Sequence, residues 1–265
     1  MILSIPMYQV DAFTTKIFGG NPAAICMLEQ DLPDQVLQKI AAENNLAETA
    51  FVWKHTGHYK IRWFTPEIEV DLCGHATLAS GFVLFNLLHE LENPIQFESR
   101  SGLLTVSKEN DGRLVLDFPE DKIIDANIPD HLSEALNSKI LKCVRGKSDY
   151  LVQVETEEIL QELQPDLTQI KKINARGLIV TAKGSDVDFV SRCFFPQSGI
   201  DEDPVTGSAH TTLVPFWSSI LDKKRFIARQ ISKRQGTLYL ESRGDRVLIG
   251  GYAAHYLTGS IFIEV

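Results

Sequence analysis

The sequence lacks the features of several large classes of protein. Its apolar segment at residues 78–88 is too short to span a bilayer, and no longer apolar run is present. Lys and Arg total 26 against 35 Asp and Glu, a net charge of −9, which excludes a general basic surface for nucleic acid or an anionic membrane. The first residues lack a basic segment followed by an apolar one, so we expect no signal peptide. A cytoplasmic protein that binds a small anionic substrate in a local pocket fits these absences.

Metal and cofactor motifs are also missing. The sequence has four cysteines, none in C-x-x-C spacing, and neither a Walker loop nor a Gly-x-Gly-x-x-Gly motif. We therefore expect no metal and no cofactor. At 265 residues with 44% hydrophobic residues, the chain can build a core that needs no disulfide.

What the sequence does contain is an internal repeat. Four segments recur in the same order after about half the chain, at offsets of 130 to 134 residues: Arg62–Pro66 with Arg192–Pro196, Gly74–Thr77 with Gly207–His210, residues 97–106 with 231–240, and residues 113–116 with 246–249. We predict two homologous halves, residues 1–125 and 126–265, with a linker at 125–129 and a last strand, 260–265, that returns to the first half. The alternative is that two unrelated α+β domains share a common strand-turn-helix rhythm.

The expected secondary structure follows this repeat. Strands are expected at residues 7–13, 23–28, 50–53, 59–64, 96–107, 113–118, 178–182, 188–195, 235–242 and 246–251, and helices at 32–44, 76–88 and 209–221. The second helix is apolar on nearly every side, which indicates burial all round. We therefore predict an α+β fold of two pseudo-symmetric halves, each a barrel-like, mostly antiparallel sheet around a central helix.

In each half a polar loop leads directly into this buried helix. The loops are residues 67–75 and 199–210, and each contains a glycine, Gly74 or Gly207, that lets a ligand approach the backbone. Helix N-termini offer unpaired N–H groups and a positive dipole end, so two of them facing one cleft would hold a carboxylate or an enolate. The alternative is an ordinary helix start capped by Thr206 or Ser208.

The motifs of the chain resemble those of the phenazine-biosynthesis PhzF-like family. They are Asn21-Pro22 after Val10-Asp-Ala-Phe13, Asn45-Leu-Ala-Glu-Thr49, Asp71-Leu-Cys-Gly-His-Ala-Thr77 and Asp201-Glu-Asp-Pro-Val-Thr-Gly-Ser-Ala209. The resemblance covers residues 8–252 and implies the diaminopimelate-epimerase fold, in agreement with the repeat. It also implies a cofactor-free isomerase that moves a proton, as the family does on trans-2,3-dihydro-3-hydroxyanthranilate, and a homodimer.

Carried over residue by residue, the resemblance makes Glu48 the acid/base and places His75 and Asp203 in the site. The apolar neighbours of Glu48 would desolvate its carboxylate and favour its protonated form, although without the resemblance a solvated glutamate would be the simpler interpretation. At an offset of 130, Glu48 aligns with Leu178, so the acid has no twin in the second half. Candidate substrate-binding residues are Cys73, Gly74, Thr206, Gly207 and Ser208, whereas His210 is expected to be structural.

Two other functions stay open. Epimerases of this fold use one thiol per half, and Cys73 occupies the first thiol position, which would suit an amino-acid racemase or epimerase. The second position is Thr206, which is no carbon base at neutral pH, so this function is disfavoured. The third hypothesis is a non-catalytic metabolite-binding module, because a fold alone does not establish an activity.

Overall fold

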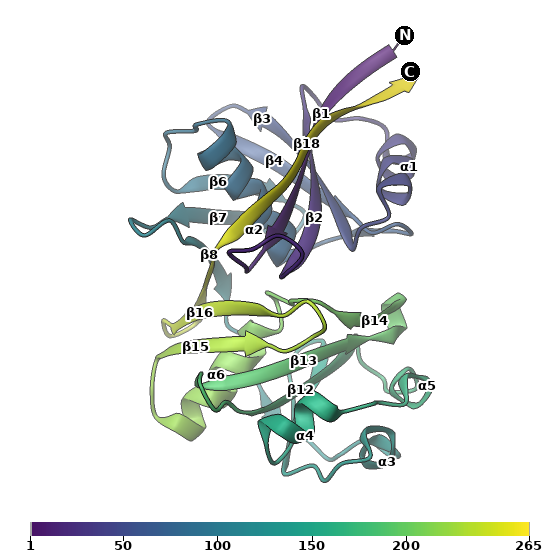
Figure 1. Ribbon diagram of the computed structural model, residues 1–265, viewed down its shortest axis with the longest axis vertical. Helices are drawn as coiled ribbons and strands as arrows, with labels where there is room; N and C mark the ends of the chain where they lie inside the picture. The colour runs from purple at the N-terminus through teal and green to yellow at the C-terminus, as the bar shows by residue number, and fades with distance from the viewer. Residues whose placement is uncertain (1, 265) are drawn as a thin grey trace. The chain divides into compact units, whose positions relative to one another are not determined.

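The computed structural model describes residues 2–264 (Figure 1). The chain forms two compact units. The first comprises the residues up to Asp117 together with those from Gly250 onwards, and the second comprises Phe118–Ile249. None of the helices in the described part of the chain is long and apolar enough to cross a membrane.

The first unit is a strongly bent sheet with one outer and one inner helix. Its strands are β1 (Ile2–Ala12), β2 (Asn21–Leu28), β3 (Glu48–His55), β4 (His58–Phe64), β5 (Glu69–Val70), β6 (Ile95–Ser99), β7 (Gly102–Lys108), β8 (Leu114–Pro119) and β18 (Ala253–Glu264). Its helices are α1 (Asp34–Asn44), α2 (Gly74–Phe82) and the π-helical turn η1 (Val83–Leu87). β18 pairs antiparallel with β1 along its length, so the last strand belongs to the first unit.

The second unit has the same kinds of elements. Its strands are β9 (Ile124–Asp125), β10 (Lys142–Arg145), β11 (Asp149–Gln153), β12 (Gly177–Lys183), β13 (Phe189–Phe195), β14 (Ile200–Asp203), β15 (Arg225–Gln230), β16 (Gly236–Ser242) and β17 (Arg246–Gly251). Its helices are α3 (Leu132–Leu136), α4 (Glu157–Glu162), α5 (Leu167–Ile170), the 3-10 turn η2 (Pro196–Ser198) and α6 (His210–Leu221).

The strand pairings confirm the internal repeat. In the first unit β2 and β3 are parallel, β3 and β4 antiparallel, β4 and β6 parallel, and β6 and β7 antiparallel. In the second unit β11 and β12, β12 and β13, β13 and β15, and β15 and β16 show the same four relations in the same order. A shared general rhythm does not produce this match of direction strand by strand, so the two units have one topology.

Each unit also repeats one ion pair at the same place in its sheet. Arg62 on β4 binds both carboxylate oxygens of Glu69 on β5, at 2.8 and 2.7 Å, and lies 5.1 Å from the Phe64 ring centre. Arg192 on β13 binds both oxygens of Glu202 on β14, at 2.7 and 2.9 Å, and lies 5.1 Å from the ring centre of Phe194. Glu69 lies on the short strand β5 in the first loop, and Glu202 lies on the short strand β14 in the second loop. The sequence pattern predicted neither strand.

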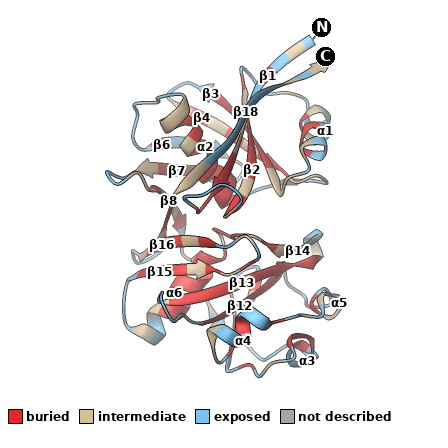
Figure 2. Ribbon diagram, viewed as in Figure 1, coloured by how far each residue is buried: buried red, intermediate tan, exposed pale blue. Residues whose placement is uncertain are grey.

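A buried helix occupies the inside of each unit, as the apolar pattern predicted. Every residue of α2 from Gly74 to Gly81 is buried, and α2 packs against β1, β2, β3, β7 and β18. Figure 2 shows α6 largely in the colour of buried residues, and its Phe216 and Trp217 are among the largest fully buried side chains. The outer faces of the two sheets are covered separately, by α1 in the first unit and by α3, α4 and α5 in the second.

Several predicted element boundaries differ from the structure, including those of residues 96–107 and of the second helix. Residues 96–107 form two strands, β6 and β7, because Gly102 adopts a positive φ of 95° and closes a tight turn at residues 100–101. The helix predicted at 76–88 begins earlier, at Gly74, and its last turn is the π-helical η1. The first error concerns a glycine, whose freedom at positive φ leaves no mark in the apolar periodicity.

Candidate active site

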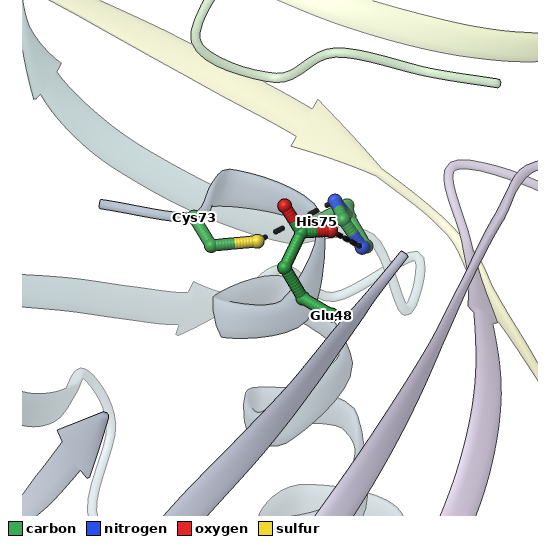
Figure 3. Close-up of side chains that lie close together, drawn as sticks. All are labelled: Glu48, Cys73 and His75. Atoms are coloured by element: carbon green, nitrogen blue, oxygen red, sulfur yellow. Dashed lines mark hydrogen bonds and ion pairs between the residues drawn. The ribbon is translucent and has the colours of Figure 1, made fainter. Parts of the chain in front are cut away.

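Three of the predicted site residues come together in the first unit. Glu48 is the first residue of β3, Cys73 directly precedes α2, and His75 is the second residue of α2, after the buried Gly74. Figure 3 shows the Cys73 thiol and the Glu48 carboxylate beside the His75 imidazole, each joined by a dashed line to a different ring nitrogen. The Glu48 Oε2 lies 3.3 Å from His75 Nε2, and Cys73 Sγ lies 3.5 Å from His75 Nδ1. The Glu48 side chain is 14% exposed and that of His75 is 5% exposed.

His75 is a neutral imidazole at physiological pH. Burial lowers the pKa of His75 to about 3, because an imidazolium would lose its hydration there. The side-chain amide nitrogen of Asn21, at the start of β2, donates to His75 Nδ1 over 3.2 Å. The ring proton therefore belongs on Nε2, which faces Glu48. The contact between Nε2 and Oε2 is within ion-pair distance, although its geometry falls short of a hydrogen bond.

The same three side chains offer ligand atoms that could hold a metal ion, all within 4.8 Å of one another. A metal bound to one imidazole nitrogen lies in the ring plane, on the outer side of that nitrogen. Here the thiol contacts Nδ1 and the carboxylate contacts Nε2. The thiol and the carboxylate thus contact different nitrogens of the ring, an arrangement that suits proton transfer.

Asp203 and Thr206 are joined to each other in the second unit. The Thr206 hydroxyl donates to Asp203 Oδ2 at 2.5 Å, and the backbone N–H of Thr206 donates to Gln230 Oε1 at 2.8 Å. The Gln230 amide in turn donates to the Asp203 carbonyl at 2.8 Å. Gln230, on β15, thus holds the loop in place, and nothing in its sequence neighbourhood identified it.

The central helices begin without side-chain caps. Neither α2 nor α6 has a side-chain hydrogen bond at its cap position, so the capping role considered for Thr206 and Ser208 is wrong. Thr206 is engaged by Asp203, and Ser208 follows the buried Gly207 in a turn that precedes α6. His210 is buried, and its Nδ1 contacts the Thr206 carbonyl at 2.8 Å, in keeping with the expected structural role.

Sequence reasoning missed Arg176, which contacts Ser208. Nη1 and Nη2 of Arg176 lie 3.5 and 3.4 Å from the Ser208 Oγ. Arg176 directly precedes β12, in a stretch that none of the recurring segments covers. A single arginine in an unmatched loop carries no signal in one sequence.

The strand register corrects the predicted counterpart of Glu48. Thr49 pairs with Phe64, and Leu178 pairs with Phe194, so the match of the two phenylalanines places Gly177, not Leu178, at the position of Glu48. The alternation of side chains along a strand makes this one-residue difference a change of face. Leu178 packs in the core beside Phe194. Its side chain therefore lies on the face of β12 that corresponds to the face of β3 opposite Glu48. Glu48 therefore has no acidic counterpart in the second unit.

Nearly the whole chain is similar to known proteins. Residues 10–259 match the family described as phenazine biosynthesis-like protein, PhzC-PhzF. This chain belongs to that family. A protein of Pseudomonas aeruginosa named an uncharacterized isomerase is 47% identical, over 98% of this chain and 100% of its own length. The crystal structure of a PhzF-family protein from Enterococcus faecalis is 45% identical, with a TM-score of 0.95, over 98% of this chain and 100% of that one.

The predicted fold class is confirmed by the same comparisons. A predicted epimerase from Pseudomonas aeruginosa is 19% identical and has a TM-score of 0.78, over 97% of this chain and 99% of that one. At this identity it shows the fold alone. Together with the PhzF-family structure it supports the two-unit, epimerase-like α+β architecture that the repeat predicted.

Proposed function

We propose that this protein is a cofactor-independent isomerase that shifts a proton within a small, unsaturated carboxylic acid, with or without an amino group. The observation that carries this proposal is the Glu48 carboxylate, 14% exposed, at 3.3 Å from the buried His75. Membership of the PhzF-like family and relatives that are named isomerases support it. The substrate that this proposal favours is trans-2,3-dihydro-3-hydroxyanthranilate or a close analogue.

In the proposed reaction Glu48 takes a proton from one carbon, and the electrons of the broken C–H bond move into the unsaturated system. Glu48 then returns a proton to a second carbon on the same side, so substrate and product are isomers and no electrons are lost. The protonated Nε2 of His75 faces the carboxylate at 3.3 Å, within ion-pair distance. Asp203 binds an amine or hydroxyl group, while Cys73, Gly74, Thr206, Gly207 and Ser208 contact the rest of the substrate.

The direct test is turnover of trans-2,3-dihydro-3-hydroxyanthranilate in D₂O, followed by proton NMR. We expect Glu48→Gln to lower turnover by roughly 10²–10⁴-fold, the usual contribution of a general acid/base, and to keep the ligand bound. Glu43→Gln, on the exposed face of α1, is the matched control and should turn over like the wild type. A fully active Glu48→Gln protein would rule out the mechanism, and an inert wild type would rule out this substrate.

A racemase or epimerase is the second candidate, because the Cys73 thiol lies 3.5 Å from the His75 ring. It predicts deuterium exchange at the α-carbon of an amino acid and loss of that exchange in Cys73→Ser. In the second unit the corresponding residue, Thr206, donates to Asp203 and is not a base, which favours the isomerase.

The non-catalytic alternative predicts a ligand that raises the melting temperature without any deuterium exchange. A homodimer also remains a proposal. Light scattering coupled to gel filtration would test it, since a monomer at working concentration excludes it.

A further inference from the structure

Arg176 is held rigidly although its side chain is 40% exposed. Its Nε donates to Asp149 Oδ1 at 2.9 Å and its Nη2 donates to Asp149 Oδ2, which makes a two-pronged ion pair with a carboxylate that is only 4% exposed. The guanidinium also lies 5.0 Å from the centre of the Phe195 ring. The backbone N–H of Arg176 donates to the Ser148 carbonyl at 2.7 Å. Little side-chain entropy is left for a ligand to remove.

This anchoring leaves donors of the guanidinium available on the side of Ser208. An arginine has five N–H groups, and the pair with Asp149 uses two of them. The remaining contacts, to the Ser208 Oγ at 3.4 and 3.5 Å, are at the long limit of hydrogen bonding. An incoming anion oxygen could therefore take hydrogen bonds from both Nη1 and the Ser208 hydroxyl without breaking the pair with Asp149.

Gly177, the residue after Arg176, leaves room for the Phe195 ring. A Cβ on Gly177 would lie 2.1 Å from Phe195 Cδ1, so the ring occupies the space into which a side chain would project. Gly177 is the counterpart of Glu48, and Ser208 is the counterpart of His75. Phe195 thus excludes a second acid in this unit, and the same ring supports the guanidinium.

We propose that Arg176, together with Ser208, binds a carboxylate of the substrate and makes the protein selective for acids over their neutral analogues. This inference rests on the proposed function, because it assigns a binding group for the same small acid. Arginine suits the task because its planar, permanently charged fork matches a carboxylate. With a net charge of −9, the protein as a whole repels such a substrate, and a fixed local cation offsets this repulsion at the site.

A matched pair of probes tests this selectivity: 2-aminobenzoate, and 2-aminobenzamide, in which a neutral amide replaces the carboxylate. We expect the full-length wild type to bind the acid at least about ten-fold more tightly than the amide in calorimetric titrations. Arg176→Gln should weaken binding of the acid by about 10–100-fold and leave the amide within two-fold, so that the preference disappears. Arg145→Gln is the control, since Arg145 contacts Tyr150 and the Asn174 carbonyl in the same unit.

The outcomes separate a binding role from a structural one. If Arg176→Gln lowers the melting temperature yet keeps the preference for the acid, Arg176 only neutralises Asp149 and the inference is overturned. A wild type with no preference, or one that binds neither probe at millimolar concentration, overturns it as well. Glu48→Gln should keep the preference. If Glu48→Gln retains turnover while Arg176→Gln loses the preference, the proton mechanism fails and the carboxylate site stands.

Discussion

The two units share a framework and differ in what they place at the start of their central helix. In the first unit the second residue of the helix is His75, and the first residue of a neighbouring strand is an acid, Glu48. In the second unit the residue corresponding to His75 is Ser208, and the side chain that reaches it is a cation, Arg176. One topology therefore presents an acid with a neutral imidazole in one copy and a hydroxyl with a fixed positive charge in the other.

The contacts that the two units share explain how the residues at the start of the central helices can differ. The ion pairs of Arg62 with Glu69 and of Arg192 with Glu202 fix the loop geometry in both units. The residues that differ lie at a strand end and at a helix start, where no repeated contact depends on them. A duplicated fold can therefore assign proton transfer to one copy and anion binding to the other, as we propose here.

The largest stability effect that follows from this comparison is at Gly177. A Cβ there would lie 2.1 Å from Phe195 Cδ1 and 2.6 Å from the Phe194 carbonyl oxygen, and backbone cannot move away cheaply. We expect Gly177→Ala to lower the free energy of unfolding by about 2–4 kcal/mol in urea titrations. Gly259→Ala is the control, because the nearest neighbour of its Cβ is 3.7 Å away, at Leu257 Cδ2. A Gly177→Ala protein as stable as this control would show that Phe195 does not exclude a side chain here.

The next effect concerns the buried histidine near the start of each central helix. Burial lowers the pKa of His75 to about 3 and that of His210 to about 4. Below a pH of about 6.5 the unfolded chain binds protons that the folded chain does not, so stability falls as the pH drops towards 4. Each histidine contributes up to about 1.4 kcal/mol per pH unit in this window.

Urea unfolding at several pH values between 7.5 and 5 tests this slope. His210→Gln should flatten it by the contribution of one histidine. His131→Gln, at a side chain that is 66% exposed, should leave it unchanged. An unchanged slope in His210→Gln would mean that this ring gains its proton in the folded state as readily as in the unfolded one.

The sequence predicted the framework better than the differences between its copies. Recurring segments identified the duplication. Apolar patterns located both buried helices, because buried side chains recur along the sequence with the period of the secondary structure. The motifs led to Glu48, Cys73 and His75, which the structure brings together. Arg176, just before β12, and Gln230, on β15, were not predicted because they contact the loop from distant parts of the sequence, and such contacts leave no local pattern.

The counterpart of Glu48 shows a second limit. The offset of 130, taken from the motif Arg62–Pro66, was carried back along the strand without change and ended on Leu178. The pairings place Gly177 there, because the connection between β3 and β4 differs in length from that between β12 and β13. A one-residue change in a turn is invisible to segment matching and decides which face of the sheet a side chain occupies.

The smallest predicted effect concerns which ring nitrogen of His75 carries the proton. Asn21 holds the imidazole through Nδ1, at 3.2 Å, and the tautomer with its proton on Nε2 follows from this contact. We expect nitrogen-15 NMR of the wild-type protein to show a neutral His75 protonated on Nε2 at pH 7. Asn21→Asp offers Nδ1 only an acceptor, so it should move a proton onto Nδ1 and lower turnover by about ten-fold, well short of the loss in Glu48→Gln.

Asn44→Asp provides the control for this last variant, because Asn44 donates to Thr49 Oγ1 at 3.2 Å, next to Glu48 in sequence, without touching the imidazole. It should keep the Nε2–H tautomer. A wild-type ring protonated on Nδ1 would contradict the assignment, since the Asn21 amide would then present its oxygen to the ring. His75 Nε2 would in that case be an acceptor facing a carboxylate, which would require Glu48 to carry the proton in the resting enzyme.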